Sequence, residues 1–263
     1  MDSATSAYAL ADLRRRTGAE NIEAICAGRV PDKAQWVFAH FGLEPLNARL
    51  DVYVRARDLI DPRVPVIDGS EPLSRALRRL EASGESSLPV RETATGKFLG
   101  MLSPVKLLGL FLNKSDLDIP TAQAPLFREG LVLSENDRVY DIRRTAVRDA
   151  HNHFPVVSDA GVLRGTVLKR AFAEEPPYRM ILVDHNETAQ GIPGVDEIPI
   201  IEVVDHHRIS FAPTREPIRY MADVVGSTCT LVTRLYRAAG LRPTKEIAGV
   251  LIAGIVADTL LFQ

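Results

Sequence analysis

Apolar residues along the chain alternate between helical and strand-like spacing, which predicts an α/β fold. In residues 3–16 small and apolar residues recur at helical spacing, so we predict a helix that opens the chain. A short apolar strand is predicted at residues 22–26, and a second helix begins at Pro31. The helical spacing places three aromatic side chains of this second helix in the core: Trp36, Phe38 and Phe41.

The middle of the chain carries one pattern twice. Each copy has the order strand, helix, strand, strand, helix, and the copies cover residues 54–113 and 128–175. A polar segment with prolines, residues 113–128, is predicted to link them. The copies share two anchors: the tripeptides Leu88-Pro89-Val90 and Phe154-Pro155-Val156, and the glycines Gly100 and Gly165.

Long apolar runs resume after the repeat. Residues 179–184 and 198–205 are typical of strands buried on both faces of a parallel sheet. Residues 245–257 are predicted to form a helix, with Asp258 just beyond its end. We therefore predict an α/β domain with a parallel sheet, interrupted by the repeated module. The predicted segments are residues 1–53 and 176–263 for the α/β domain, and residues 54–175 for the insert.

Composition narrows the possible partners. The chain has 263 residues with 46% hydrophobic residues, which is enough for real cores, and its formal charge of -2 argues against nucleic acid binding. The two cysteines have no metal-ligand spacing and indicate neither a disulfide framework nor a zinc site. No apolar run approaches the length of a membrane helix, so we expect a soluble, cytoplasmic protein with no membrane partner.

Three polar clusters follow the predicted apolar elements, where ligands bind in open α/β sheets. They are Asp184-His185-Asn186-Glu187, Asp205-His206-His207 and Asp258-Thr259. A carboxylate at the end of a buried strand is partly desolvated, so it favours a compensating cation. Carboxylates combined with imidazole suit Mn²⁺, Co²⁺ or Fe²⁺ and predict a metal-assisted hydrolase. Taken singly, such residues also fit turn capping or an ordinary polar surface.

The motifs around these clusters resemble the DHH phosphoesterase superfamily, and specifically the family II, manganese-dependent inorganic pyrophosphatases. The resemblance rests on four segments: residues 182–187, 203–208, 225–228 and 253–262. The repeat resembles a pair of CBS modules, and its insertion into the DHH domain is similar to the CBS-containing, nucleotide-regulated pyrophosphatases. The Asp-His-Asn-Glu sequence distinguishes pyrophosphatases from nuclease-like relatives.

The resemblance implies a role for each site residue. Asp184 would bridge two metal ions, and three residues would complete the site of one of them: Asp2, His206 and Asp258. Asp205 would orient its neighbours, and His207 would contact a substrate phosphate and assist proton or charge handling. The implied substrate is pyrophosphate, the implied cofactor is Mn²⁺ or Co²⁺, and Mg²⁺ would accompany the substrate.

The chain also departs from the family pattern. The family begins with an apolar strand and a His-x-Asn-Pro-Asp-x-Asp motif, whereas this chain starts within that motif, at Met1-Asp2-Ser3. It stops at Gln263, before the family's second, substrate-clamping domain. We therefore expect a fragment of an enzyme, with little activity of its own.

The CBS signature is incomplete as well. Of the ribose-phosphate positions only Ser103 matches, so it is our candidate nucleotide-binding residue for AMP, ADP or ATP. The resemblance further implies a homodimer. Two other hypotheses stay open: a non-catalytic module that binds adenine nucleotides, and a DHH phosphodiesterase acting on short oligonucleotides.

Overall fold

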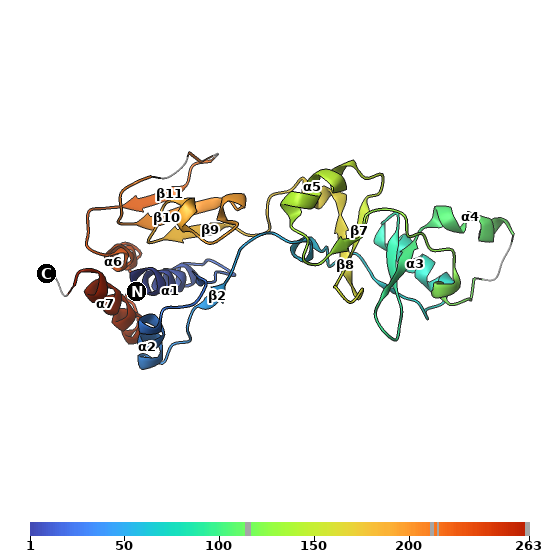
Figure 1. Cartoon of the computed structure of the whole chain (residues 1–263). Coiled ribbons are helices and arrows are strands. Elements are labelled where there is room, and N and C mark those ends of the chain that lie inside the picture. Colours follow the sequence, from blue (N-terminus) through green and yellow to red (C-terminus); the bar gives the residue numbers. More distant parts are fainter. Residues whose placement is uncertain (114–116, 211–212, 215, 261–263) are drawn as a thin grey trace. The chain divides into compact units, whose positions relative to one another are not determined.

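The computed structural model describes residues 1–113, 117–210, 213–214 and 216–260, and it divides into two compact units (Figure 1). Unit 1 comprises Met1–Tyr53 and Tyr178–Gln263, and unit 2 comprises Val54–Pro177. Across the described ranges, every helix is too short or too polar to cross a membrane. Phe262, the last residue of the fourth motif, and residues 114–116 of the linker lie outside the described residues.

A parallel sheet forms the centre of unit 1. Its strands, in the order β11-β10-β9, are β9 (Met180–Val183), β10 (Ile200–Asp205) and β11 (Arg219–Ala222). Both pairings of β10 are parallel, which confirms the predicted α/β class. Val203 and Val204 of β10 are completely buried, because this middle strand has a neighbour on either side and side chains packed on its faces.

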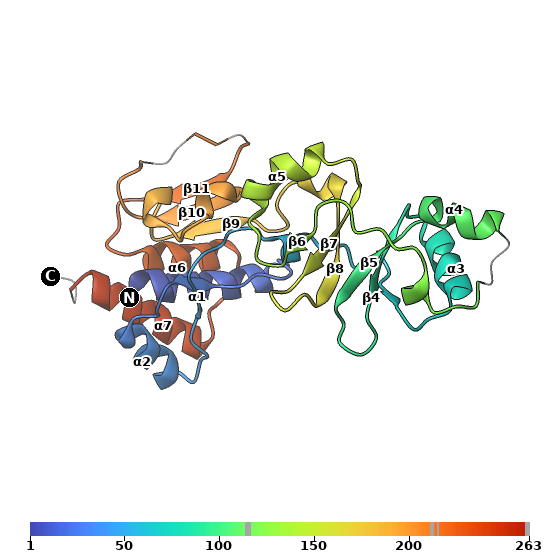
Figure 2. The same cartoon turned by 45° about the vertical axis from the view of Figure 1, so that its right-hand side comes forward.

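Helices pack against this sheet and against one another (Figure 2). The helices of unit 1 are α1 (Asp2–Arg16), α2 (Asp32–His40), α6 (Thr228–Ala238) and α7 (Lys245–Asp258). Helix α1 contacts α6, α7 and strand β9, and α2 contacts α7. Two short strands, β1 (Ile25–Ala27) and β2 (Asn47–Arg49), pair in parallel. The first residues of α1 and the last residues of α7 therefore belong to one packed layer.

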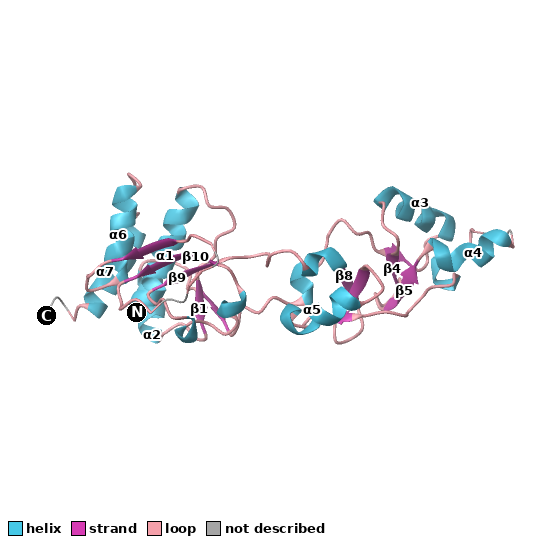
Figure 3. Cartoon of the chain, turned by 90° about the horizontal axis from the view of Figure 1, so that it is seen from above, coloured by secondary structure: helices cyan, strands magenta, loops and turns pink. Residues whose placement is uncertain are grey.

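Unit 2 contains the predicted repeat (Figure 3). The first copy consists of β3 (Ile67–Asp68), α3 (Leu73–Ser83), β4 (Leu88–Arg91), β5 (Phe98–Leu102) and α4 (Pro104–Leu112). The second consists of β6 (Leu133–Ser134), α5 (Val139–Arg148), β7 (His153–Val157), β8 (Leu163–Leu168) and the 3₁₀ helix η3 (Lys169–Phe172). In both sheets the first pair of strands is parallel and the second pair antiparallel. Further 3₁₀ turns are η1 (Ala56–Leu59), η2 (Thr121–Gln123), η4 (Thr188–Gln190) and η5 (Val195–Glu197).

The two anchor glycines occupy equivalent positions in this repeat. Gly100 pairs with Val90, and Gly165 pairs with Val156, each next to a shift in strand register. Another segment packs closely over each glycine: a Cβ atom on Gly165 would lie 2.5 Å from Cγ2 of Ile60. The segment packed over each glycine thus leaves no room for a side chain at position 100 or 165.

The structure corrects three details of the sequence-based prediction. Trp36 is 66% exposed and stacks on His40, because it lies two residues from the buried Phe38 and therefore on the opposite side of α2. Asp258 is the last residue of α7 rather than a residue beyond it. The second repeat ends in the short 3₁₀ helix η3 instead of a full counterpart of α4.

Candidate metal centre

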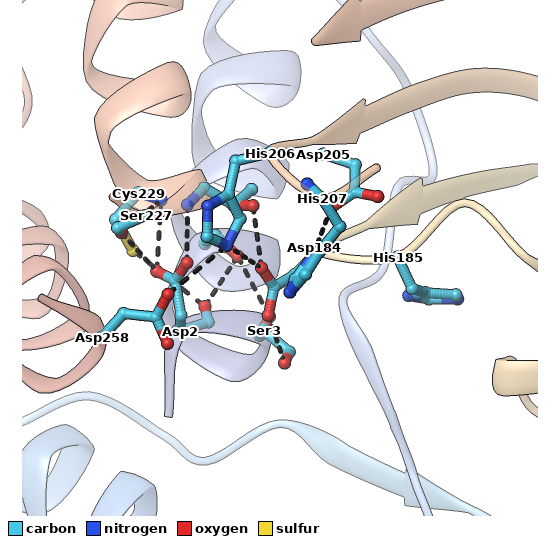
Figure 4. Close-up of polar contacts among 12 residues, drawn as sticks. Asp2, Ser3, Asp184, His185, Asp205, His206, His207, Ser227, Cys229 and Asp258 are labelled. Atoms are coloured by element: carbon cyan, nitrogen blue, oxygen red, sulfur yellow. Dashed lines mark hydrogen bonds and ion pairs between the residues drawn. The ribbon is translucent and has the colours of Figure 1, made fainter. Parts of the chain in front are cut away.

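The ends of β9 and β10 lie side by side, so the polar residues that follow them meet (Figure 4). The backbone N–H of Asp184 donates to the carbonyl of Val204 at 2.9 Å, which holds the two strand ends together. His206 and His207 directly follow the last residue of β10. The start of α1 and the end of α7 bring further carboxylates to the same place.

Asp184 has a constrained backbone. Its φ angle of 65° lies in the left-handed region, which costs about 1–2 kcal/mol for a residue with a Cβ. Its carboxylate accepts hydrogen bonds from the hydroxyl of Ser3 at 2.6 Å and of Thr228 at 2.8 Å. Burial raises the pKa of Asp184, and the nearby charge of Asp2 raises it further, while the two hydroxyl bonds oppose the rise. A cation beside this carboxylate would offset its desolvation.

Asp2 is held by the N-terminus of α6. Its carboxylate accepts hydrogen bonds from the hydroxyl of Ser227 at 2.8 Å and from the backbone N–H groups of Thr228 and Cys229 at 2.6 and 3.2 Å. A negative charge at a helix N-terminus is stabilised by the orphan N–H groups and the helix dipole. Helix α6 therefore fixes the orientation of the Asp2 carboxylate, which is 2% exposed.

His206 faces two carboxylates with an unpaired nitrogen. Its Nδ1 lies 2.9 Å from the carbonyl oxygen of Val225, which only accepts, so Nδ1 carries the proton and Nε2 of the neutral ring has a lone pair. Nε2 lies 3.6 Å from Oδ1 of Asp184 and 3.3 Å from Oδ2 of Asp258. Among the described residues this buried Nε2 has no hydrogen-bond partner. A lone pair between two carboxylates is repelled by both unless a cation lies among them.

Asp205 lies behind the histidines and is completely buried. Its Oδ1 accepts from Nδ1 of His207 at 2.7 Å and its Oδ2 accepts from Nδ2 of Asn186 at 2.6 Å. Burial would raise the pKa of Asp205, but the hydrogen bonds from Asn186 and His207 outweigh it and the pKa is lowered. The hydrogen bond between Nδ1 of His207 and Oδ1 of Asp205 also raises the pKa of His207. The negative charges of Asp205, Asp184 and Asp258 raise it by smaller amounts, and burial opposes the rise.

The donor atoms form two overlapping groups that share His206. One contains Asp184, His206 and His207, and the other contains Asp2, His206 and Asp258; within each group the ligand atoms lie within 4.8 Å of one another. Carboxylate oxygens combined with imidazole nitrogens match the ligand preferences of Mn²⁺ and Co²⁺. Together with the unpaired Nε2 of His206, this donor set fits a divalent transition metal ion.

Helix α7 approaches this centre closely at Gly254, one turn before Asp258. A Cβ atom at Gly254 would lie 2.4 Å from Sγ of Cys229 and 2.5 Å from Oγ1 of Thr5. Only glycine allows α7 to pack this tightly against α1 and α6. The absence of a side chain at position 254 thus sets the distance of Asp258 from His206.

The structure brings most of the predicted site residues together. Those in the two donor groups are Asp2, Asp184, His206, His207 and Asp258, with Asp205 directly behind His207. Ser103 belongs to unit 2, where it precedes α4 without a side-chain capping bond. No role was predicted from the sequence for Ser3, Asn186, Thr228 and Gly254. Asn186, Thr228 and Gly254 lie within the motif segments named above. The signal that could have identified Ser3 and Asn186 is a hydroxyl or amide side chain close in sequence to a predicted ligand.

Comparison with protein families gives evidence on the identity of the chain that does not depend on the geometry of the site. The model of the DHH family, N-terminal domain, matches residues 1–255. The chain belongs to the DHH family.

Two relatives of this chain are named as metal-dependent enzymes. The cobalt-dependent inorganic pyrophosphatase of Clostridium perfringens is 32% identical over 133 residues, which is 51% of this chain and 24% of that protein. The manganese-dependent inorganic pyrophosphatase of Bacillus subtilis is 44% identical over 84 residues, 32% of this chain and 27% of that protein. The DHH chain thus spans about a quarter of the length of these relatives.

Among solved structures, a CBS domain-containing protein from Bacillus anthracis superposes on 46% of this chain and 90% of its own, with a TM-score of 0.38 and 21% sequence identity.

Proposed function

We propose that this DHH chain forms the metal-binding part of an inorganic pyrophosphatase, which hydrolyses pyrophosphate to two phosphates with Mn²⁺ or Co²⁺. The observation that carries the proposal is the unpaired Nε2 of His206, which lies between the carboxylates of Asp184 and Asp258. The manganese- and cobalt-dependent relatives support the choice of metal and substrate.

Each side chain has a distinct task in this proposal. Asp2, Asp184, His206 and Asp258 would hold the metal, which supplies Lewis-acid stabilisation of negative charge on phosphoryl oxygens. His207, half exposed and bound to Asp205 through Nδ1, would meet the substrate, and the hydrogen bond to Asp205 raises its pKa and so favours the protonated form. It would neutralise charge on a phosphate or pass a proton to it.

The test combines metal binding with phosphate release. Calorimetric titration of the chain with Mn²⁺ should show binding that His206→Gln weakens at least about 10-fold, because the change removes a ligand. Phosphate release from pyrophosphate is then measured with Mn²⁺ for this chain and for a version extended into its flanking coding sequence. Absence of Mn²⁺ binding, or of hydrolysis by both versions, would contradict the proposal.

A second function is favoured by unit 2. A small pocket lies between β5 and β7, with room for about one water molecule, so a nucleotide would have to widen it. It is lined by Phe98, Met101, Phe127, Arg128, Glu129, Gly130, Leu131, Val132, His153 and Pro155. We propose that unit 2 binds adenine nucleotides at this place and that binding regulates the enzyme, because the aromatic rings suit a base and the guanidinium of Arg128 suits a phosphate, although the carboxylate of Glu129 opposes one. Ser103 does not line this pocket.

Two substitutions separate the pocket from the predicted residue. Calorimetry with AMP and with ATP is carried out on the chain, on Arg128→Ala and on Ser103→Ala. Loss of binding only in Arg128→Ala assigns the nucleotide to the pocket, and loss only in Ser103→Ala assigns it to the start of α4. A chain that binds neither nucleotide would exclude this function.

A further inference from the structure

Asn186 connects the loop after β9 to the loop after β10. Its side chain is 3% exposed, and its Nδ2 donates both to Oδ2 of Asp205 at 2.6 Å and to the carbonyl of Arg208 at 2.9 Å. Its Oδ1 accepts from the backbone N–H of Ser210 at 2.8 Å. Three of the four hydrogen bonds available to an amide side chain are therefore made, all to residues 205–210.

These bonds determine which oxygen of Asp205 meets His207. Asp205 is completely buried, so each of its oxygens needs a donor. Asn186 occupies Oδ2, which leaves Oδ1 for the backbone N–H and Nδ1 of His207 at 3.2 and 2.7 Å. With Nδ1 engaged, the proton of the neutral ring stays on Nδ1 and Nε2 is the nitrogen available to a ligand.

The same residue restrains the backbone on both sides of the histidines. Asp205 precedes them and Arg208 follows them, and Asn186 bonds to both. Asn186 itself lies two residues after Asp184, whose backbone is constrained at a φ of 65°. The side chain of Asn186 thus links the segment that carries Asp184 to the segment that carries His206 and His207.

We infer that Asn186 is a positioning residue of the metal centre. It fixes the Asp205 carboxylate, which in turn fixes the tautomer and direction of the His207 ring. The inference rests on the proposed function for its catalytic meaning, but the arrangement itself is measurable without metal or substrate. Asn186 contacts neither the donor groups nor the substrate in this account, so it acts only through Asp205 and the backbone of the loop.

The test uses the ring nitrogens of the histidines. In the metal-free chain with ¹⁵N-labelled histidine, measured at a pH above the raised pKa of His207, we expect a protonated Nδ1 and an unprotonated Nε2. Asn186→Ala should shift His207 towards a mixture of tautomers. It should also weaken Mn²⁺ binding about 10-fold, because the loop that carries His206 loses its link to the segment that carries Asp184. The matched control is Asn47→Ala, because Asn47 also donates to a carboxylate, Oε1 of Glu23, at 2.6 Å.

Two further variants make the result decisive. Asn186→Asp keeps the shape but replaces a donor to Asp205 by an acceptor, and should alter the His207 signals even if Asn186→Ala fails to fold. In an Asp205→Ala background, Asn186→Ala should change the His207 signals much less than it does in the wild type, because only its bonds to the backbone of the loop remain. Wild-type His207 signals in a folded Asn186 variant, or an additive effect in the double variant, would overturn the inference. Failure of the wild-type chain to bind Mn²⁺ would instead contradict only the proposed function.

Discussion

Nε2 of His206 lies 3.3 Å from Oδ2 of Asp258, yet the two atoms form no hydrogen bond. The proton of the neutral ring is on the other nitrogen, which donates to Val225. In the metal-free chain this contact is therefore repulsive unless the ring takes up a second proton. The unpaired Nε2 of His206 beside the carboxylate of Asp258 indicates a site that is complete only when a cation is bound.

The first prediction concerns the balance between stability and metal binding. His206→Gln should change the thermal unfolding temperature of the metal-free chain little, because it removes both the unpaired Nε2 and the hydrogen bond from Nδ1 to Val225, and these losses oppose each other. It should also reduce the stabilisation that Mn²⁺ gives the wild type by up to about 1.4 kcal/mol for a 10-fold loss of affinity, since ligand binding stabilises with the logarithm of the ratio of free ligand to Kd. Calorimetric melting with and without Mn²⁺ measures both effects. His40→Gln, an exposed histidine of unit 1, is the control and should retain the full effect of Mn²⁺.

The second prediction concerns the close packing of α7. Gly254→Ala should destabilise the chain by about 1–3 kcal/mol, as overpacking does, and should weaken Mn²⁺ binding because Asp258 moves away. Adding Thr5→Ala and Cys229→Ala removes the two nearest atoms and should recover most of both losses. Gly109→Ala is the control: position 109 in α4 has open space around it, so the helix should gain about 0.8–1 kcal/mol. Chemical denaturation gives the free energies, and an uncompensated triple variant would count against the steric explanation.

The third prediction concerns pH. The folded-state pKa of His207 is raised above 6.5, so its contribution to stability is complete below that pH and is lost as the pH rises through the folded value. The pKa of Asp205 is lowered below 3.8, so its contribution is present above that pH and is lost on acidification. The pair should therefore stabilise the metal-free chain most between these two values. Denaturation curves from pH 3 to pH 9, at roughly one-unit intervals, test this window.

A variant isolates the cause of the His207 shift. Asp205→Asn should lower the pKa of His207 towards 6.5, because the hydrogen bond to a carboxylate is its largest cause. Asp258→Asn should lower it much less, since Asp258 acts only through its charge. NMR titration of the histidine ring reports both values. Equal effects of the two substitutions would show that the hydrogen bond is not the main cause.

The fourth prediction concerns Trp36, the single tryptophan of the chain. Because its ring is 66% exposed, its fluorescence should resemble that of indole in water and should be quenched efficiently by iodide. Trp36→Ala should change the free energy of unfolding by no more than about 0.5 kcal/mol, as is usual for surface positions. A blue-shifted, poorly quenched emission would show that α2 is packed differently.

Periodicity and motif spacing predicted the α/β class, the repeat and the segments that carry the centre. The strand ends were predictable because the largely apolar runs end at Asp184 and Asp205. Glu202 inside β10 does not end its strand, because its carboxylate pairs with Arg14. The exposure of Trp36 was not predictable, because the sequence of a nine-residue helix with apolar residues on several sides does not reveal which side is buried.

The finer parts of the centre depend on contacts between distant segments. The role of Gly254 follows from the positions of Thr5 and Cys229, on two other helices. The role of Asn186 follows from a loop that begins after the next strand. Local sequence contains no information on such distances, so only the folded arrangement identifies these residues.

The interrupted sequence of unit 1 has a consequence for synthesis on the ribosome. Helix α1 packs on α6 and α7, which are translated only after all of unit 2, whereas unit 2 is one continuous segment. Unit 2 can therefore fold first. The parallel sheet of unit 1 and the helices packed on it can form only after α6 and α7 have left the ribosome. During that interval α1 can contact α2, as Tyr8 contacts Phe38, but the residues of α1 that pack on α6 and α7 lack those partners. Nascent chains stalled before α7 should therefore be the ones that engage chaperones.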